Sequence, residues 1–521
     1  MDIAFLVLLA PLSLLAVAAT HWTANARDRR FAASASYMAV LGSLGVAAVS
    51  AAAVAIWGSV STSLIGFGEV GLALRLDPLS VTMFLLVAFV GLIVVRFSRN
   101  YLDGDPRQDR FFAGLCMTLA AVILLILAGN VWHLVAAWIA TSLALHRLLV
   151  FYPDRPRAIA AARKKFLAAR LGDGCLVIAA FLVTGHFGTA DIGKLLALAA
   201  SPAVEATAGL TAAAVLIALA ALLKSAQFPA HGWLIEVMET PTPVSALLHA
   251  GIVNAGGFLV LRFADLMVLS PAAMILLTAI GGLTAIFGSL VMLCQTSAKV
   301  SLAYSTVAQM GFMMLQCGLG VFPIALLHIV AHSLYKAHAF LSAGAAAEAV
   351  AAARPGAQVP SGIRQGTAGW KVAVITVIVA GIVAYSLAAG QPAMVALGVI
   401  IAAGLSQFVV AGSVGGPVPL RRTAGIAVLL TLIWAGLHTG AYAIHGAHLP
   451  PPPSLGAGQI AMLIFIVAGF IGAAIVQWLA PVKSHSQRWQ AIRCALANGL
   501  YTNAVFDRIA TALVPSQALR S

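Results

Sequence analysis

The stretch Ala220-Ala-Leu-Leu-Lys224-Ser-Ala-Gln-Phe-Pro229 decides the fold of this chain. It closes an apolar run over residues 207–228, which is long enough for a membrane-spanning helix of about twenty residues. Pro229 must break this helix shortly after the lysine, and a broken helix frees carbonyl groups that can hold a cation or water at membrane depth. The stretch therefore predicts a broken transmembrane helix whose lysine either belongs to an ion path or extends to the cytoplasmic interface.

The composition of the whole chain is that of a polytopic membrane protein. Of its 521 residues, 61% are hydrophobic and 9% are charged, and the net charge is +14. Soluble domains carry about 25% charged residues, so this composition excludes a cytosolic enzyme, a disordered chain and a secreted disulfide scaffold. A basic excess in a membrane protein is typical of cytoplasmic loops, and we expect no nucleic-acid partner. The five cysteines have no metal-ligand spacing, and we expect neither a metal nor a cofactor.

Apolar runs of the required length recur along the whole chain and predict an all-α membrane protein with about 13–15 transmembrane helices. The candidate spans are residues 2–20, 32–57, 78–97, 111–129, 131–151, 170–188, 207–228, 243–263, 271–294, 301–318, 323–349, 371–389, 393–414, 424–446 and 456–481. The first run has no basic segment before it, so it predicts a helix and not a cleaved signal.

The loop charges predict the orientation. Basic residues fall mostly after odd-numbered spans, for example Arg27 after the first, Arg99 after the third and Arg155 after the fifth. Because positive loops favour the cytoplasmic side, we expect the N-terminus outside and the C-terminus in the cytoplasm. The loop after the seventh span departs from this pattern, since it carries Glu236 and Glu239. The polar tail over 482–521 has a helical apolar stripe, which predicts an amphipathic helix at the interface or one docked on a partner subunit.

The eleventh predicted span carries an unusual series of basic residues. His328, His332 and Lys336 follow at steps of four, with His338 and Glu348 further along. Four residues advance a helix by about 6 Å and turn it by about 400°, so the first three share one face. A single membrane histidine is more often a helix–helix hydrogen-bond partner, but three basic groups on one face are hard to explain in that way. Since histidine titrates near neutrality, this face is predicted to exchange protons.

Two further polar positions accompany this series. His249 lies in the eighth predicted span, with Asn254 a little further along. Alone it is a weak candidate, but it becomes a stronger one because it could connect Lys224 to the face of His328, His332 and Lys336. Arg170 and Asp173 open the sixth span at a spacing of three, which is typical of a structural ion pair on a helix.

These residues resemble a known signature. The stretch Lys224-Ser-Ala-Gln-Phe-Pro-Ala-His-Gly-Trp-Leu-Ile-Glu236, with His249 beyond it, is similar to the antiporter-like, proton-conducting subunits of respiratory complex I and the Mrp antiporters. The resemblance covers roughly residues 70–350. It includes Arg75-Leu-Asp77, Arg170-Leu-Gly-Asp173, Ala303-Tyr-Ser-Thr-Val-Ala-Gln309-Met-Gly311 and His328-x3-His332-x3-Lys336.

The resemblance implies a fold and a set of roles. It implies a bundle of spans with inverted repeats, in which the counterpart of Lys224 carries protons and the counterparts of His249, His332 and Lys336 continue a hydrated relay. We accordingly divide the chain into N-terminal helices over 1–110, an antiporter-like core over 111–414, C-terminal helices over 415–481 and the tail. The expected proton path is Lys224, His249, His328, His332, Lys336 and His338, supported by Arg170, Asp173, Pro229, Glu236 and Glu239.

The chain departs from the family pattern in two places. Members usually have a glutamate in the fifth span that tunes the broken-helix lysine, and here that position holds Ile139. The second broken helix usually supplies another lysine or glutamate, but residues 372–412 contain no acid or base. Without the glutamate, Lys224 needs another counter-charge, for which Asp173 and Glu236 are the candidates.

These departures are similar to those of DabB-type membrane subunits of bacterial inorganic-carbon accumulation complexes. The resemblance implies a bacterial inner-membrane subunit, not itself an enzyme, that conducts protons and energises hydration of CO2 to bicarbonate by a large zinc-binding, carbonic-anhydrase-like partner. Alternatives are a subunit of a complex I, hydrogenase or Mrp Na⁺/H⁺ assembly, or a membrane anchor that conducts nothing.

Overall fold

The computed structural model describes residues 3–23, 29–152, 154–353, 378, 381–383, 385–386, 391–414, 420–479, 486–504 and 508. In this part of the chain, nine helices are long and apolar enough to cross a membrane, and three shorter apolar helices accompany them. The prediction of an all-α polytopic membrane protein is therefore confirmed. Each predicted span coincides with a described helix except 371–389, which falls largely outside the described residues.

The helices follow one another in this order: η1 (Ile3–Leu8), α1 (Leu9–Thr23), α2 (Arg29–Trp57), α3 (Pro78–Tyr101), α4 (Gln108–Ile126), α5 (Val131–Leu149), α6 (Pro156–Phe187), α7 (Ile192–Ala199), α8 (Ala208–Lys224), α9 (Gly232–Glu236), η2 (Val237–Glu239), α10 (Thr242–Ala250), η3 (Ile252–Asn254), α11 (Ala255–Arg262), α12 (Ala264–Val268), α13 (Pro271–Leu293), α14 (Ala298–Gly318), α15 (Phe322–Ala353), α17 (Pro392–Val414), α18 (Leu420–His445), α19 (Ala457–Leu479), α20 (Gln487–Ala497) and η4 (Gly499–Tyr501). Here η marks 3-10 helices.

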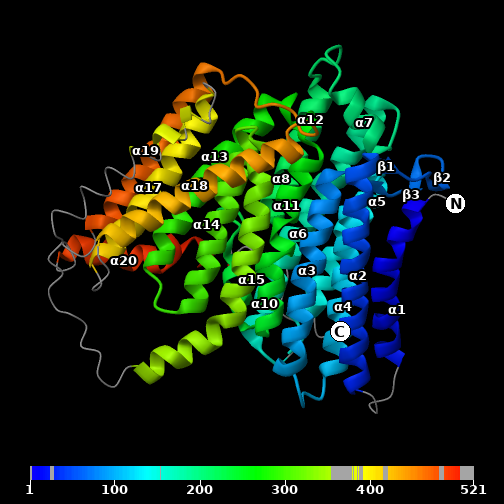
Figure 1. Cartoon of the computed structure of the whole chain (residues 1–521), viewed down its shortest axis with the longest axis horizontal. Coiled ribbons are helices and arrows are strands. Elements are labelled where there is room, and N and C mark those ends of the chain that lie inside the picture. Colours follow the sequence, from blue (N-terminus) through cyan, green and yellow to red (C-terminus); the bar gives the residue numbers. More distant parts are fainter. Residues whose placement is uncertain are drawn as a thin grey trace.

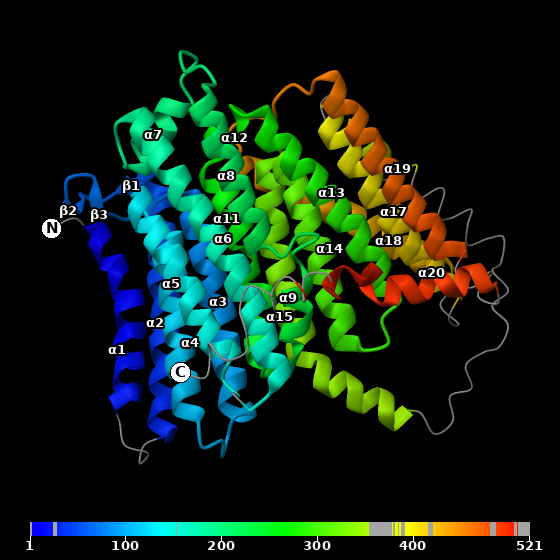
Figure 2. The same cartoon turned by 180° about the vertical axis from the view of Figure 1, so that it is seen from behind.

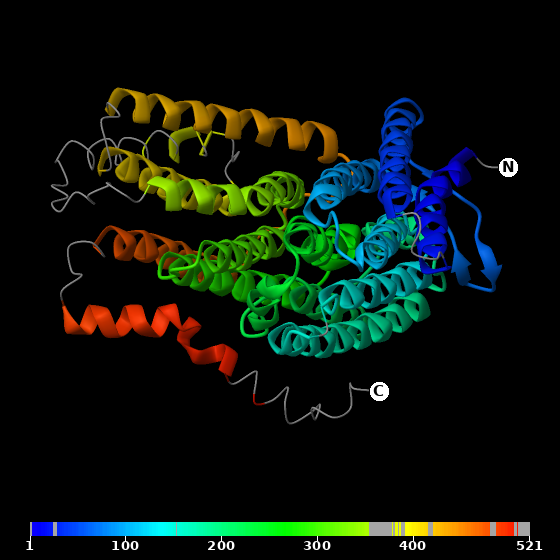
Figure 3. The same ribbon diagram turned by 90° about the horizontal axis from the view of Figure 1, so that it is seen from below.

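The middle of the bundle is its most buried part. In α10 and α11, 94% of the residues in the most apolar stretch are buried, against 17% in α19. Figure 3 shows the green central segments with the blue and cyan helices on one side and the yellow and orange helices on the other. Because lipid is as apolar as the exposed leucines and isoleucines of α18 and α19, this gradient is expected for a membrane bundle. The polar groups of α10 therefore lie in the most buried part of the described bundle.

Four short strands interrupt the helical order between α2 and α3, and the sequence did not predict them. They are β1 (Val60–Ser61), β2 (Ile65–Phe67), β3 (Val70–Leu72) and β4 (Arg75–Leu76). Strands β1 and β4 pair antiparallel, as do β2 and β3. They lie at the same end of the bundle as α7 (Figures 1 and 2).

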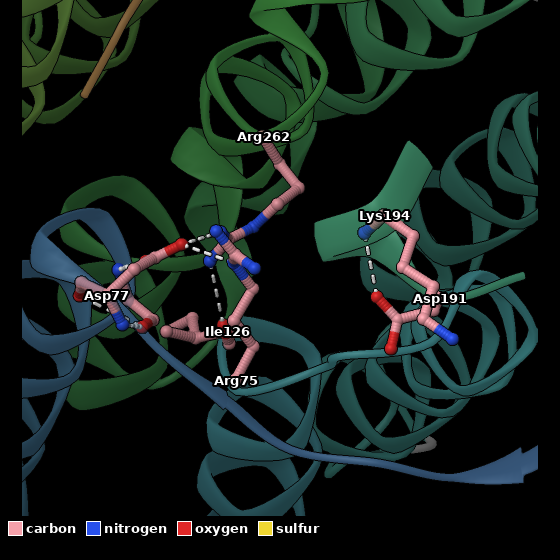
Figure 4. Close-up of polar contacts among 7 residues, drawn as sticks. Arg75, Asp77, Ile126, Asp191, Lys194 and Arg262 are labelled. Carbon is pink, nitrogen blue, oxygen red and sulfur yellow. Dashed lines mark hydrogen bonds and ion pairs between the residues drawn. The ribbon is translucent and has the colours of Figure 1, made fainter. Parts of the chain in front are cut away.

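A buried ion cluster fixes the start of α3 against α11 at this end of the bundle (Figure 4). Asp77 caps α3 by accepting a hydrogen bond from the backbone N–H of Ser80 at 2.8 Å. Its other carboxylate oxygen accepts from Arg262 at 2.5 Å and from Arg75 at 2.7 Å. Burial acts to raise the pKa of Asp77, but the two guanidinium groups outweigh it and hold that pKa well below its usual range. The Arg75-Leu-Asp77 motif is thus a structural anchor, and Arg262 completes it.

Figure 4 also shows the cap of the neighbouring short helix. Asp191 precedes α7 and accepts a hydrogen bond from the backbone N–H of Lys194 at 2.9 Å. A carboxylate at a helix N-terminus satisfies a free N–H and interacts favourably with the helix dipole.

The described part of the tail returns to the bundle. Helix α20 has no buried residue of its own, but the carbonyl of Ala497 at its end accepts a hydrogen bond from Gln295 at 3.1 Å. Asn503 reaches Glu236 with a hydrogen bond of 2.6 Å. The predicted helical tail is confirmed over 487–497, and residues 509–521 lie outside the described residues.

Candidate ion path

The end of α8 is the predicted helix break. The backbone N–H of Gln227 donates to the carbonyl of Leu222 at 3.2 Å, and Ala226 between them has a positive φ of 50°. This is the pattern of a helix closed by a left-handed residue. The helix stops at Lys224, and α9 does not begin until Gly232, so the predicted broken helix around Pro229 is confirmed.

Lys224 is held inside the bundle at this break. Its Nζ donates a hydrogen bond to the hydroxyl of Ser142 on α5 at 2.9 Å, and it lies 4.4 Å from the ring centre of Trp138. The side chain is buried with 7% exposure. Lys224 therefore does not extend to the surface of the bundle, and its ammonium group would depend on a hydroxyl, an aromatic face and nearby charge for stabilisation.

The two candidate counter-charges have different partners. Asp173 forms the predicted ion pair with Arg170 at 2.5 Å, and its charge also acts on Lys224. Glu236 instead pairs with Lys164 and accepts the hydrogen bond of Asn503. Of the two candidates, Asp173 is therefore the one whose charge acts on Lys224, whereas Glu236 joins α6 and the tail. The side chain of Glu239 lies outside the described residues.

A second polar cluster surrounds Lys336 on α15. Its Nζ donates to the backbone carbonyl of Leu302 at 3.0 Å, and the hydroxyl of Thr306 donates to the same carbonyl at 3.1 Å. The Nδ1 of His249 lies 3.0 Å from the Thr306 hydroxyl oxygen, and its ring stacks on Phe340 at 4.4 Å. One carbonyl therefore joins the lysine of α15 to the histidine of α10 through a threonine of α14.

The protonation of His249 follows from these contacts. Because the hydroxyl hydrogen of Thr306 is used toward Leu302, its oxygen accepts and Nδ1 of His249 carries the hydrogen. The Nε2 atom of His249 is buried and has no hydrogen-bond partner among the described residues. With the hydrogen on Nδ1, this nitrogen carries a lone pair that could accept a proton.

His332 continues the cluster from the same face as Lys336. Its Nε2 lies 3.1 Å from the carbonyl of His249, and its Nδ1 lies 2.5 Å from Oε1 of Gln309. A neutral imidazole has one N–H, so either both ring nitrogens donate in the charged form or the Gln309 amide turns to donate its own N–H. This position can therefore hold either protonation state. His328, one turn away, has its Nδ1 3.0 Å from Gln316.

His338 does not join these residues. It is exposed on α15, whereas Lys336 is fully buried. A step of two residues turns a helix by about 200°, which places His338 on the opposite side. The structure therefore does not bring His338 together with the other predicted path residues.

The two clusters are connected through η3, the short segment between α10 and α11. The hydroxyl of Ser225, just after Lys224, donates to the carbonyl of Val253 in η3 at 2.7 Å. A Cβ atom at Gly256 would lie 2.3 Å from the Ser225 hydroxyl and 2.4 Å from the carbonyl of Ala221, so only glycine permits this approach. In the same region, Asn254 donates to Ser333 at 2.8 Å and so joins the α10–α11 break to α15.

Several of these positions were missed from the sequence. Ser142 is a small polar residue in a largely apolar span, and serines and threonines there commonly bond to their own helix. Thr306 lies inside Ala303–Gly311, one of the stretches that resemble the family, and this resemblance could have indicated its importance. The carbonyl of Leu302 gives no sequence signal, since every residue has one.

The comparisons agree with this architecture. Residues 128–414 match the family model described as NADH:quinone oxidoreductase/Mrp antiporter, and residues 64–112 match that of the complex I chain 5 N-terminus. The chain therefore belongs to the family of antiporter-like membrane subunits of complex I and Mrp assemblies.

Individual relatives refine this placement. The chain is 39% identical, over 88% of its length and 83% of the relative's, to the probable inorganic carbon transporter subunit DabB2 of Halothiobacillus neapolitanus. It is 48% identical, over 52% of both chains, to the probable inorganic carbon transporter subunit DabB of Hydrogenovibrio crunogenus. Among solved structures, the Mrp complex of Dietzia sp. is similar with a TM-score of 0.66 and 25% identity, over 98% of this chain and 60% of that one.

Proposed function

We propose that this chain conducts protons through the membrane and that the flow energises hydration of CO2 to bicarbonate on a zinc-bearing, carbonic-anhydrase-like partner. The proposed path is Lys224, His249, Lys336, His332 and His328. Arg170 and Asp173 support its Lys224 end, which lies at the helix break before Pro229.

One observation carries the conducting part of the proposal. The series Lys336, Leu302 carbonyl, Thr306, His249, His332 and Gln309 is joined by hydrogen bonds of 2.5 to 3.1 Å inside an apolar bundle. Ionisable groups at membrane depth are costly and usually mark an ion or proton pathway. Imidazole and amine groups exchange protons directly, whereas they are poor ligands for Na⁺, which prefers oxygen ligands. The residue types therefore favour H⁺.

The coupling part of the proposal is supported by the relatives. Two of them are named as probable inorganic carbon transporter subunits, and this chain spans most of the length of one. If CO2 is hydrated on the partner, the proton flow through this subunit can drive that reaction in one direction only when the partner's reaction is coupled to it.

The proposed orientation has the N-terminus outside and the C-terminus in the cytoplasm of a bacterial inner membrane. The α3–α4 loop, which carries Arg107, lies at the end of the bundle opposite α7 in Figures 1 and 2. Positive loops favour the cytoplasmic side, which would place α7 and the strand ribbons outside.

The partner is tested by purifying the full chain from its native membrane with the subunits that accompany it. A soluble subunit with bound zinc is expected. Iron–sulfur subunits would instead indicate a redox assembly, and several small membrane proteins an Mrp-type antiporter. An uncoupler should also abolish inorganic carbon uptake by the complex, whereas an inert anchor predicts no effect.

A further inference from the structure

The Lys224 site contains a second buried lysine. Lys165 has 4% exposure, and its Nζ donates to the backbone carbonyl of Ser142 at 2.6 Å. The hydroxyl of the same serine accepts the hydrogen bond of Lys224. Two amines from α6 and α8 therefore meet at one residue of α5.

Lys165 was hidden from the sequence because α6 is longer than its predicted span. The helix begins at Pro156 and not at residue 170, so the basic segment that resembled a loop continues into the bundle. Its neighbour Lys164 pairs with Glu236, toward the tail. Lys165, on the next position of the helix, is turned by about 100° and faces α5 instead.

The charges around Ser142 do not balance when both amines are protonated. Lys165, Lys224 and Arg170 are then positive, and Asp173 is the carboxylate that acts on all three. His146, one turn along α5 from Ser142, adds no negative charge. Arginine does not release its proton in proteins, and uncompensated charge in an apolar interior is costly. The imbalance is relieved when one of the two lysines is neutral.

We propose that Lys165 and Lys224 form a proton-sharing pair across Ser142, in which Lys165 supplies the proton that Lys224 passes on. This inference rests on the proposed proton conduction. The step moves one proton from the Lys165 ammonium to the neutral Lys224 amine. Lys165 becomes neutral as Lys224 becomes charged, so the charge of the pair does not change. Repulsion between the amines then assists release of the proton from Lys224 when Lys165 is reprotonated from the loop side.

Beside the Asp173 counter-charge, the pair gives Lys224 a second source of tuning in a chain that has Ile139 where the family usually has a glutamate. A carboxylate would tune Lys224 by attraction, and it would have to move or change its own charge to let the proton leave. A second lysine tunes Lys224 by repulsion and carries the next proton itself. Lys165 is thus a proton carrier of the same site and not only a structural contact.

The test uses the full chain with its accompanying subunits, reconstituted in liposomes, with proton flux followed by a pH-sensitive dye. Lys165→Met and Lys165→Arg should each lower the flux at least about tenfold, the usual minimum effect of a proton-transfer group. Arginine keeps the positive charge and a donor for the Ser142 carbonyl but cannot release a proton. Lys194→Met, at an exposed lysine of α7, is the matched control and should stay within about twofold of wild type.

Flux restored by Lys165→Arg would show that a fixed charge or hydrogen bond suffices, which overturns the inference. Wild-type flux in both variants would also overturn it. The proposed conduction is tested separately by Lys224→Ala. If this variant abolishes flux while the Lys165 variants do not, only the shared pair fails.

Discussion

Lys224 and Lys336 are two buried lysines of one bundle in contrasting surroundings. Lys224 lies among charges, with Arg170, Asp173 and Lys165 acting on it. Lys336 lies among neutral groups, a backbone carbonyl and the two histidines. The difference teaches that a membrane lysine can be made to exchange protons by charge balance or by a hydrogen-bonded relay. In the proposed path, Lys224 would use the first of these and Lys336 the second.

Replacing either lysine should have the largest effect. Lys224→Ala and Lys336→Ala should each abolish inorganic carbon uptake by the complex, a loss of about a hundredfold or more, because no other group at those positions carries the proton. Uptake is measured in membranes that contain equal amounts of assembled complex. Normal uptake in both variants would contradict the proposed proton path and the contrast drawn between Lys224 and Lys336.

Neutralising Asp173 should affect the charged half selectively. Asp173→Asn leaves the charges of Arg170 and Lys224 without their carboxylate, and we expect the proton flux to fall about tenfold. The control is Glu236→Gln, since Glu236 pairs with Lys164. This variant should weaken the attachment of the tail through Asn503 but leave the proton flux largely unchanged. Equal losses of flux in the two variants would contradict the assignment of Asp173 as the counter-charge.

Interrupting the neutral half should have a smaller effect. Thr306→Val keeps the shape of the side chain but removes the hydroxyl between His249 and the Leu302 carbonyl. We expect flux to fall about three- to tenfold, since water can bridge part of the lost connection. Dye-reported flux measures the change. A loss as large as that of Lys336→Ala would mean that the hydroxyl is itself obligatory.

The smallest effect is expected at His338. His338→Gln should leave the flux within about twofold of wild type, because the side chain is exposed on the far side of α15. The matched substitution His332→Gln removes a buried group that bonds to Gln309 and the His249 carbonyl, and it should lower flux clearly. Similar proton fluxes in the two variants would contradict the assignment of His332 and His338 to different faces of α15 with different roles.

Much of the fold and part of the site could be predicted from the sequence. Helical spans follow from apolar length, and the shared face of His332 and Lys336 follows from their spacing of four. The structure does not bring His338 to these residues, because a step of two from Lys336 turns the helix by about 200°. The pairing of Glu236 with Lys164 could not be predicted, because the two residues lie 72 positions apart in the sequence. The junction at Ser142 depends on three helices meeting, which local patterns do not encode.

The short strands β1–β4 before α3 were not predicted either, because segments of two or three residues are too short to show an alternating hydrophobic pattern. The part of the Arg75–Asp77 anchor that comes from Arg262 was missed for the same reason as Ser142. In both cases a local motif was visible while its distant partner was not.

The proposed proton conduction is tested most directly by proton flux into liposomes that hold the purified complex, driven by an imposed membrane potential in the absence of Na⁺. Wild type should carry a flux well above that of empty liposomes, and a Lys224→Ala, Lys336→Ala double variant should fall to the empty-liposome level. A double variant that conducts like wild type would contradict the claim that these buried amines carry the protons.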